Sequence, residues 1–194
     1  MRTPLTGLRV LLENGLADPA SDLRQIIHSA IERADYLEDT INDIIGLSRH
    51  RQPGAPVDAA EQLDAAADRW RGPLARDARR LNVIIDADLP PVILVASALE
   101  QVLDALIENA LQHGAGTVAL RARATHGALA IDVDDEGTGI AATDQIFDHG
   151  VSYAGGSGIG LAFAQQLTAD QGGRLLLARR RPSTRFTLIF PSSP

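Results

Sequence analysis

The chain of 194 residues is 45% hydrophobic and carries a net charge of −7 at pH 7, which suits one compact domain with a smaller element and excludes a disordered tail. The acidic balance argues against binding to nucleic acids or broadly to anionic membranes, because such binding needs dense positive charge. Cysteine is absent, so disulfides and thiolate metal sites are excluded as well.

Residues 1–50 have the pattern of a helical hairpin. Thr3 followed by Pro4 is typical of a helix start, and the leucines that follow recur at helical spacing. A second, longer helix is predicted from apolar or small residues that stand alternately four and three apart, as in a coiled-coil seam: Leu23, Ile27, Ala30, Ala34, Leu37, Ile41, Ile44 and Ser48. A lone hairpin would leave half of each stripe in water, so we expect a second copy to complete a four-helix dimer. Packing of the hairpin on its own domain is the alternative.

A linker is predicted at residues 51–56, RQPGAP, because proline and glycine end a helix. Residues 57–194 then form the second domain. Its predicted helices cover residues 58 to about 80, about 97 to 113 and 159 to 173, with Asp58 capping the first and Gly114 closing the second. Its predicted strands cover residues 82–87, 117–124, 129–135, 174–180 and 184–191. Helices beside a mixed sheet make an α+β layered fold, with the helices on one face.

Three stretches of the second domain offer groups suited to a nucleotide. In LIENALQHG, residues 106–114, polar side chains share the exposed side of a helix, and the amide oxygen of Asn109 suits Mg²⁺. In DVDDEGTGI, residues 132–140, glycines let the backbone approach a flat ligand, and a carboxylate at the strand end can accept a hydrogen bond from an exocyclic amine. In GGSGIGLAFA, residues 155–164, glycines precede a helix whose free N–H groups favour phosphate. Each stretch alone also fits a plain structural explanation, as a solvated helix face or a turn.

Taken in this order, the motifs resemble the ATP-binding domain of sensor histidine kinases, within the Bergerat or GHKL superfamily. LIENALQHG is similar to the N-box, DEGTGI to the first glycine box, IFDHG to the phenylalanine box and GGSGIGLA to the second glycine box. MRTPLTGLR, at the start of the chain, resembles the phosphoacceptor box of the dimerisation hairpin, whose usual form is His-Glu-Leu/Met-Arg-Thr-Pro-Leu. The resemblance implies that the acceptor histidine and the glutamate are the two residues just before Met1. We therefore expect this chain to be a piece of a longer protein and to take no phosphate on itself.

The same resemblance implies a site for ATP and Mg²⁺ and suggests its residues. Asp135 would accept a hydrogen bond from the adenine amine, and Thr187 would assist through a water molecule. Asn109 would bind Mg²⁺, and Glu108 would polarise the attacking imidazole. His113 would reach a phosphate, unless it only interacts with the helix dipole. The other implied contacts are Gly137 and Gly139 in the first glycine box, Ile140 and Leu161 against the base, and Gly156, Ser157, Gly158, Ile159 and Gly160 in the phosphate loop.

The implied function is that of the cytoplasmic kinase portion of a sensor, which passes phosphate to a histidine and then to an aspartate of a response regulator. The implied partners are a second copy of the chain, bound through the hairpin, and that response regulator. Thr3 matches the threonine of the phosphatase motif, although helix capping explains it equally well. The longest apolar run, residues 92–99, is far shorter than the roughly 20 residues that cross a bilayer, so an inner-membrane anchor would lie outside these residues.

Three further alternatives stay open. Phe147 would either dock the lid over the nucleotide or fill the core. The whole domain would be a degenerate ATP-binding module, acting as a scaffold or as a response-regulator phosphatase, if nucleotide does not bind. A GHKL ATPase that works as a conformational clamp would be marked by a transducer domain after the ATP site.

Overall fold

The computed structural model describes residues 12, 25–27, 29–30, 54–140, 146–147 and 160–193. The chain divides into two units, residues 1–51 and 52–194. Most of the predicted hairpin lies outside the described residues, and those of its residues that are described are helical. Within the described part of the chain, no helix has the length and apolar character needed to cross a membrane.

The second unit is built around a five-stranded mixed sheet with the strand order β2-β4-β5-β7-β6. β2 runs parallel to β4, and every other neighbouring pair is antiparallel. A small antiparallel pair joins β1 (Ala55–Val57) to β3 (Val92–Leu94). The strands of the large sheet are β2 (Leu81–Ile85), β4 (Val118–Thr125), β5 (Ala128–Asp134), β6 (Arg174–Arg179) and β7 (Arg185–Pro191).

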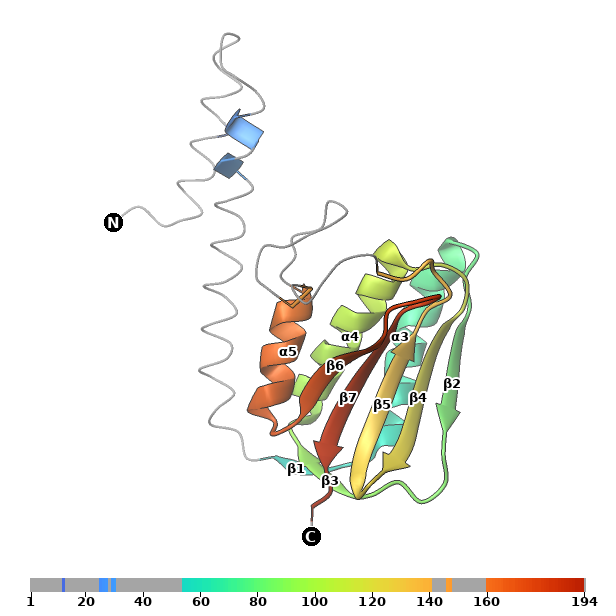
Figure 1. Cartoon of the computed structure of the whole chain (residues 1–194), viewed down its shortest axis with the longest axis vertical. Helices are drawn as coiled ribbons and strands as arrows, with labels where there is room; N and C mark the ends of the chain where they lie inside the picture. The colour runs from blue at the N-terminus through green and yellow to red at the C-terminus, as the bar shows by residue number, and fades with distance from the viewer. Residues whose placement is uncertain are drawn as a thin grey trace, which may run out of the picture. The chain divides into compact units, whose positions relative to one another are not determined.

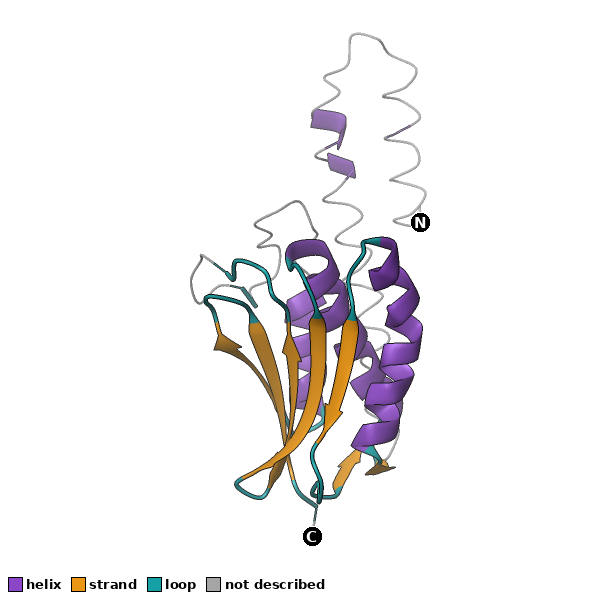
Figure 2. Cartoon of the chain, turned by 90° about the vertical axis from the view of Figure 1, so that its right-hand side faces the viewer, coloured by secondary structure: helices purple, strands orange, loops and turns teal. Residues whose placement is uncertain are grey.

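The helices α3 (Ala59–Arg76), α4 (Ala96–His113) and α5 (Gly160–Asp170) cover one face of this sheet and leave the other face open (Figures 1 and 2). The core lies between the two layers, where alternate strand residues meet the apolar sides of the helices. Its fully buried side chains include Leu63, Leu74, Leu99, Leu103, Leu106, Ile107, Leu120, Leu129, Ile131, Leu188 and Phe190. The predicted α+β fold with helices on one face of a mixed sheet is confirmed.

The predicted start of α3 is confirmed in detail, but its predicted end is wrong by four residues. The carboxylate of Asp58 accepts hydrogen bonds from the backbone N–H groups of Ala60 (2.8 Å) and Glu61 (3.3 Å). The helix runs through Pro73 and ends at Arg76, because Ala78 adopts a left-handed φ of 55° and turns the chain. This turn has the Schellman pattern, usually made by glycine, so an alanine at the same position gives no sequence signal.

The last two residues of the predicted linker lie in a short strand. Ala55 and Pro56 belong to β1 and pair with Leu94 and Ile93 of β3. Proline holds an extended φ and is tolerated in a short strand of this kind, so Pro56 is compatible with its place in β1.

Candidate functional site

Asp135 lies just beyond the end of β5 and is only 6% exposed. Its Oδ1 accepts a hydrogen bond of 2.6 Å from the backbone N–H of Gly137, and its own N–H donates to the carbonyl oxygen of Thr184 (3.2 Å). No described residue donates a hydrogen bond to the other carboxylate oxygen. A buried carboxylate with one oxygen fixed and the other unsatisfied is costly for the fold by itself, so the arrangement suits a ligand that donates to it.

Two glycines let the backbone close around this carboxylate. A Cβ atom on Gly114 would lie 2.7 Å from Cγ of Asp135, and one on Gly137 would lie 2.7 Å from Oδ1 of Asp135. Gly114 closes α4 as predicted, and its φ of −89° is one that any residue can adopt. Glycine is needed at this position for close approach to Asp135, and the N-box helix and the first glycine box therefore meet at that side chain.

The last turns of α4 carry the predicted N-box residues. Ile107 is fully buried, while Glu108 and His113 are exposed and Asn109 is partly buried. The amide of Gln112 donates to the carboxylate of Glu108 at 3.2 Å. The core-facing and outward-facing sides of this helix are therefore those that its sequence predicts.

The first glycine box is anchored to the turn between β6 and β7. Gly139 has a φ of +76°, and a Cβ there would lie 2.0 Å from the carbonyl oxygen of Arg180. The N–H of the next residue, Ile140, donates to that same oxygen at 3.0 Å. Ile140 and Leu161, the two residues expected against the base, are partly buried and pack on the core. Only glycine satisfies both the backbone angle and the close contact at position 139.

Part of the predicted nucleotide site lies outside the described residues, namely Gly156, Ser157, Gly158 and Ile159 of the phosphate loop, together with Thr3 of the hairpin. Gly160 and Leu161 are described and form the start of α5. Phe147 packs edge-on against Phe186, with ring centroids 6.2 Å apart. This contact supports the core-filling alternative for Phe147.

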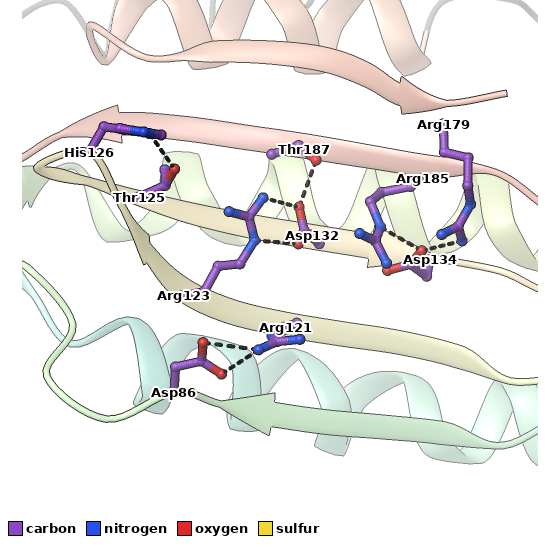
Figure 3. Close-up of polar contacts among 10 residues, drawn as sticks. All are labelled: Asp86, Arg121, Arg123, Thr125, His126, Asp132, Asp134, Arg179, Arg185 and Thr187. Atoms are coloured by element: carbon purple, nitrogen blue, oxygen red, sulfur yellow. Dashed lines mark hydrogen bonds and ion pairs between the residues drawn. The ribbon is translucent and has the colours of Figure 1, made fainter.

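Thr187 is not brought together with Asp135. It pairs with Asp132 across β5 and β7, and its hydroxyl donates to Oδ1 of Asp132 at 2.6 Å (Figure 3). Both residues point to the open face of the sheet, away from the helices. The threonine beside Asp135 is Thr184, which the sequence motifs do not single out.

Thr184 precedes β7 and is 5% exposed. Asp134 pairs with Arg185, so one further step of the register sets Thr184 opposite Asp135, on the helix-bearing face. No described residue forms a hydrogen bond with the Thr184 hydroxyl. Thr184 could have been identified by counting the strand register from the end of β5, because Thr184 and Thr187 are three residues apart and therefore face opposite sides of the sheet.

The open face carries a row of ion pairs along the strands (Figure 3). Arg123 binds both carboxylate oxygens of Asp132, at 2.8 and 3.2 Å. Burial by itself raises the pKa of Asp132, but the hydrogen bonds from Arg123 and Thr187 and the charges of Arg123 and Arg185 together hold that pKa below its usual value. Asp134 likewise binds Arg179 and Arg185, and its hydrogen bond raises the pKa of Arg185. These charged side chains form hydrogen bonds and ion pairs with one another, so we infer that they stabilise the sheet.

The described residues fit ATP and Mg²⁺ in part. Asp135 supplies a buried carboxylate oxygen and Thr184 a buried hydroxyl, neither of which forms a hydrogen bond with a described residue, and this suits an adenine ring. The described residues contain no cluster of three or more His, Asp or Glu side chains that could hold a metal. A neutral amide such as Asn109 still fits Mg²⁺, because this ion keeps several waters and takes much of its coordination from substrate phosphates.

Two family models match the chain. The His Kinase A (phospho-acceptor) domain matches residues 1–53, and the histidine kinase-, DNA gyrase B- and HSP90-like ATPase model matches residues 95–194. Among solved structures, the Acinetobacter baumannii histidine kinase AdeS has a TM-score of 0.69 at 22% identity, covering 100% of this chain and 97% of that one. Full-length ShkA, solved in complex with AMPPNP, has a TM-score of 0.68 at 26% identity, covering 93% of this chain and 41% of that one.

Curated relatives extend the similarity over nearly the whole chain. The alginate biosynthesis sensor protein KinB of Pseudomonas aeruginosa is 32% identical, covering 98% of this chain and 35% of the relative. The sensory histidine kinase/phosphatase NtrB of Vibrio alginolyticus is 28% identical, covering 98% of this chain and 59% of the relative. This chain therefore spans between about a third and three fifths of the length of these two relatives. It belongs to the sensor histidine kinases of two-component systems, with a phospho-acceptor region followed by a GHKL-type ATPase region.

Proposed function

We propose that this chain binds ATP with Mg²⁺ and transfers the γ-phosphoryl group to a histidine, for relay to an aspartate of a response regulator. The observation that supports the nucleotide site is the buried Asp135, with one oxygen held by Gly137 and the other left for a ligand. An exocyclic amine donates a hydrogen bond to a carboxylate, whereas the carbonyl oxygen at the same position of guanine would repel it. The site should therefore prefer adenine over guanine.

The other residues of the proposed site are given roles according to their positions. Thr184, beside Asp135, would hydrogen-bond the base directly or through water. Asn109 would hold Mg²⁺, which supplies neutralisation of the phosphate charge. Glu108 would orient the acceptor imidazole, and His113, Gly160 and the loop before Gly160 would bind phosphate.

In the transfer step, a nitrogen of the acceptor imidazole forms a bond to the γ-phosphorus while the bond to the β,γ-bridging oxygen breaks. ADP leaves with that electron pair, and the imidazole loses its proton towards Glu108. Because the transition state is loose, orientation and charge neutralisation contribute more than base strength.

The acceptor and the partners are further parts of the proposal. Residues 1–5 match the end of a phosphoacceptor box, which would place the histidine two residues before Met1. The hairpin would form a homodimer, and Thr3 would serve the phosphatase reaction on the response regulator. A cytoplasmic position beside an inner-membrane anchor outside these residues, as the resemblance to sensor kinases implies, is the last part of the proposal.

Titration with ATP and GTP, with and without Mg²⁺, tests the nucleotide site. Asp135→Asn keeps the shape of the side chain and an oxygen that accepts from Gly137. Its second group is an N–H₂ donor in place of a charged acceptor, so it cannot accept a hydrogen bond from the adenine amine. Loss of a hydrogen bond to a charged group costs about 1.5 to 3 kcal/mol, so Kd for ATP should rise roughly 10- to 150-fold. Asp86→Asn is the matched control, because Asp86 pairs with Arg121 on the open face. Equal binding by the Asp135 variant would contradict the assignment, and no binding by the unchanged chain would favour the scaffold alternative.

Phosphotransfer is tested by placing the upstream helix and the His-Glu pair before Met1 and following label from the γ-phosphate of ATP. Glu108→Gln should slow labelling while leaving Kd for ATP unchanged. Label that survives conversion of the added histidine to alanine would show that the acceptor lies elsewhere.

A further inference from the structure

Arg79 joins the end of α4 to the loop that follows it. Its guanidinium donates to four backbone carbonyl oxygens, two in the last turn of the helix and two in the loop. These are the oxygens of Ala110 (2.7 Å), Leu111 (3.2 Å), Ala115 (3.1 Å) and Gly116 (2.8 Å). The first two lie at the negative end of the helix dipole, where a positive charge is favourable. A planar fork with five N–H donors is suited to this number of acceptors.

The end of α3 places Arg79 for this contact. The N–H of Ala78 donates to Ala75 and the N–H of Arg79 donates to Leu74, which is the Schellman pair of hydrogen bonds. Ala78 has a φ of 55°, a conformation that costs energy for a residue with a Cβ atom. The same turn that ends α3 therefore delivers the guanidinium to α4.

Glu136 holds the loop from the other side. Its side-chain Oε2 accepts a hydrogen bond of 2.7 Å from the N–H of Thr117, and its backbone N–H donates to the carbonyl oxygen of Ala115 at 2.9 Å. Gly116 lies between these two bonds with a φ of +61°, and a Cβ there would lie 2.1 Å from Oε2 of Glu136. Ala115 thus receives hydrogen bonds from Arg79 and from Glu136 at one oxygen.

The loop held in this way carries Gly114, where an added Cβ would lie 2.7 Å from Cγ of Asp135. Glu136 is the next residue after Asp135. We propose that Arg79 and Glu136 are positioning residues that fix residues 114–117 as the wall behind Asp135 and so align its carboxylate with the adenine amine. This inference rests on the nucleotide site proposed above. Neither side chain is assigned any contact with the nucleotide.

The ratio of Kd for GTP to Kd for ATP distinguishes this positioning role from a purely structural one. Selection of the base depends on the alignment of Asp135, whereas a general loss of stability weakens both nucleotides by the same factor. For Arg79→Ala we expect Kd for ATP to rise about tenfold, by analogy with the low end of the range for groups that orient metal-binding side chains. Kd for GTP should stay nearly unchanged, so the preference for ATP falls by about the same factor.

Conservative variants and a neighbouring arginine complete the experiment. Arg79→Lys should give an intermediate preference, because one ammonium group has three donors and cannot reach four carbonyl oxygens. Glu136→Ala should lower the preference, and Glu136→Gln should largely restore it, because the amide oxygen still accepts from Thr117. Arg80→Ala is the control, since Arg80 is adjacent and exposed. Circular dichroism verifies folding, and if Arg79→Ala does not fold, the two Glu136 variants decide.

The outcomes separate this inference from the function on which it rests. If Asp135→Asn abolishes the preference for ATP while Arg79→Ala and Glu136→Ala keep it, the positioning role is refuted and the nucleotide site stands. If ATP and GTP weaken equally in these variants, the two residues are structural only and the inference is likewise refuted. If Asp135→Asn leaves the preference intact, both the inference and the nucleotide site are refuted.

Discussion

Replacing Thr187 with valine tests whether this hydroxyl supports the sheet or serves the nucleotide. Valine keeps the branched shape and the strand propensity of threonine, but it cannot donate to Asp132. The bond that is lost is 2.6 Å long and joins side chains that are 3% and 1% exposed. A hydrogen bond to a charged group contributes about 1.5 to 3 kcal/mol. Because Arg123 still binds both oxygens of Asp132, we expect a loss in that range rather than the larger cost of an unpaired buried charge.

Thermal unfolding and nucleotide titration measure the two possible effects separately. In a domain of this size, 1 kcal/mol moves Tm by roughly 2 to 4 °C, so Tm should fall by about 3 to 12 °C. Kd for ATP, measured well below Tm, should not change. Thr184→Val is the matched comparison: Kd for ATP should rise, while Tm should fall less, because no described residue bonds to that hydroxyl.

Weaker ATP binding with an unchanged Tm in the Thr187 variant would refute this reasoning. It would mean that the hydroxyl contacts the nucleotide, as the family resemblance implies, and that the register between β5 and β7 differs from the one in the structure. An unchanged Tm together with unchanged binding would show that the bond to Asp132 contributes little.

Two further predictions follow from the packing and the charges. Gly114→Ala should destabilise the fold by about 1 to 3 kcal/mol and weaken ATP binding, because the new Cβ would lie 2.6 Å from the carbonyl oxygen of Ala110. Gly72→Ala, in the exposed part of α3 and with nothing within 4 Å apart from its chain neighbours, should destabilise the fold less, because the new Cβ is crowded only by Pro73; equal effects on unfolding would contradict the contact argument. The lowered pKa of Asp132 adds stability that is present above the unfolded carboxyl pKa of about 3.9 and lost as pH falls through the folded value. Asp132→Asn should therefore flatten the acid side of the stability curve, and an unchanged curve would exclude this carboxylate as a source.

The elements that the sequence predicts well are those whose causes are local. The cap on α3 needs only Asp58 and the next three residues, and the buried side of α4 follows from apolar residues three and four apart. The core of the first glycine box is equally local, since the hydrogen bond from Gly137 to Asp135 spans two residues. A short motif contains the whole interaction in each case, so the pattern can be read without the fold.

The two threonines at position 184, just before β7, and position 187, within it, show which features the sequence pattern cannot decide. Thr184 and Thr187 lie in one stretch of similar composition, and both are buried. Which of them faces the helices beside Asp135 depends on the pairing of Asp134 with Arg185, and a shift of one residue would move every side chain to the other face. Register between strands 51 residues apart is a property of the assembled sheet, so the choice between the threonines needs the structure.

Arg79 shows the same limit for residues that hold a site together. A group that meets a ligand is restricted by chemistry to a few residue types at fixed spacing, and this restriction is what makes the boxes recognisable. A group that holds a backbone loop needs only to donate to carbonyl oxygens, here 31 to 37 residues further along the chain, and many positions would serve. Geometry still restricts the residue type at this position, because four acceptors on two sides of a turn match a guanidinium and exceed what a single ammonium can bind. If Arg79 has the role proposed for it, relatives that place lysine there should hold this loop by other contacts.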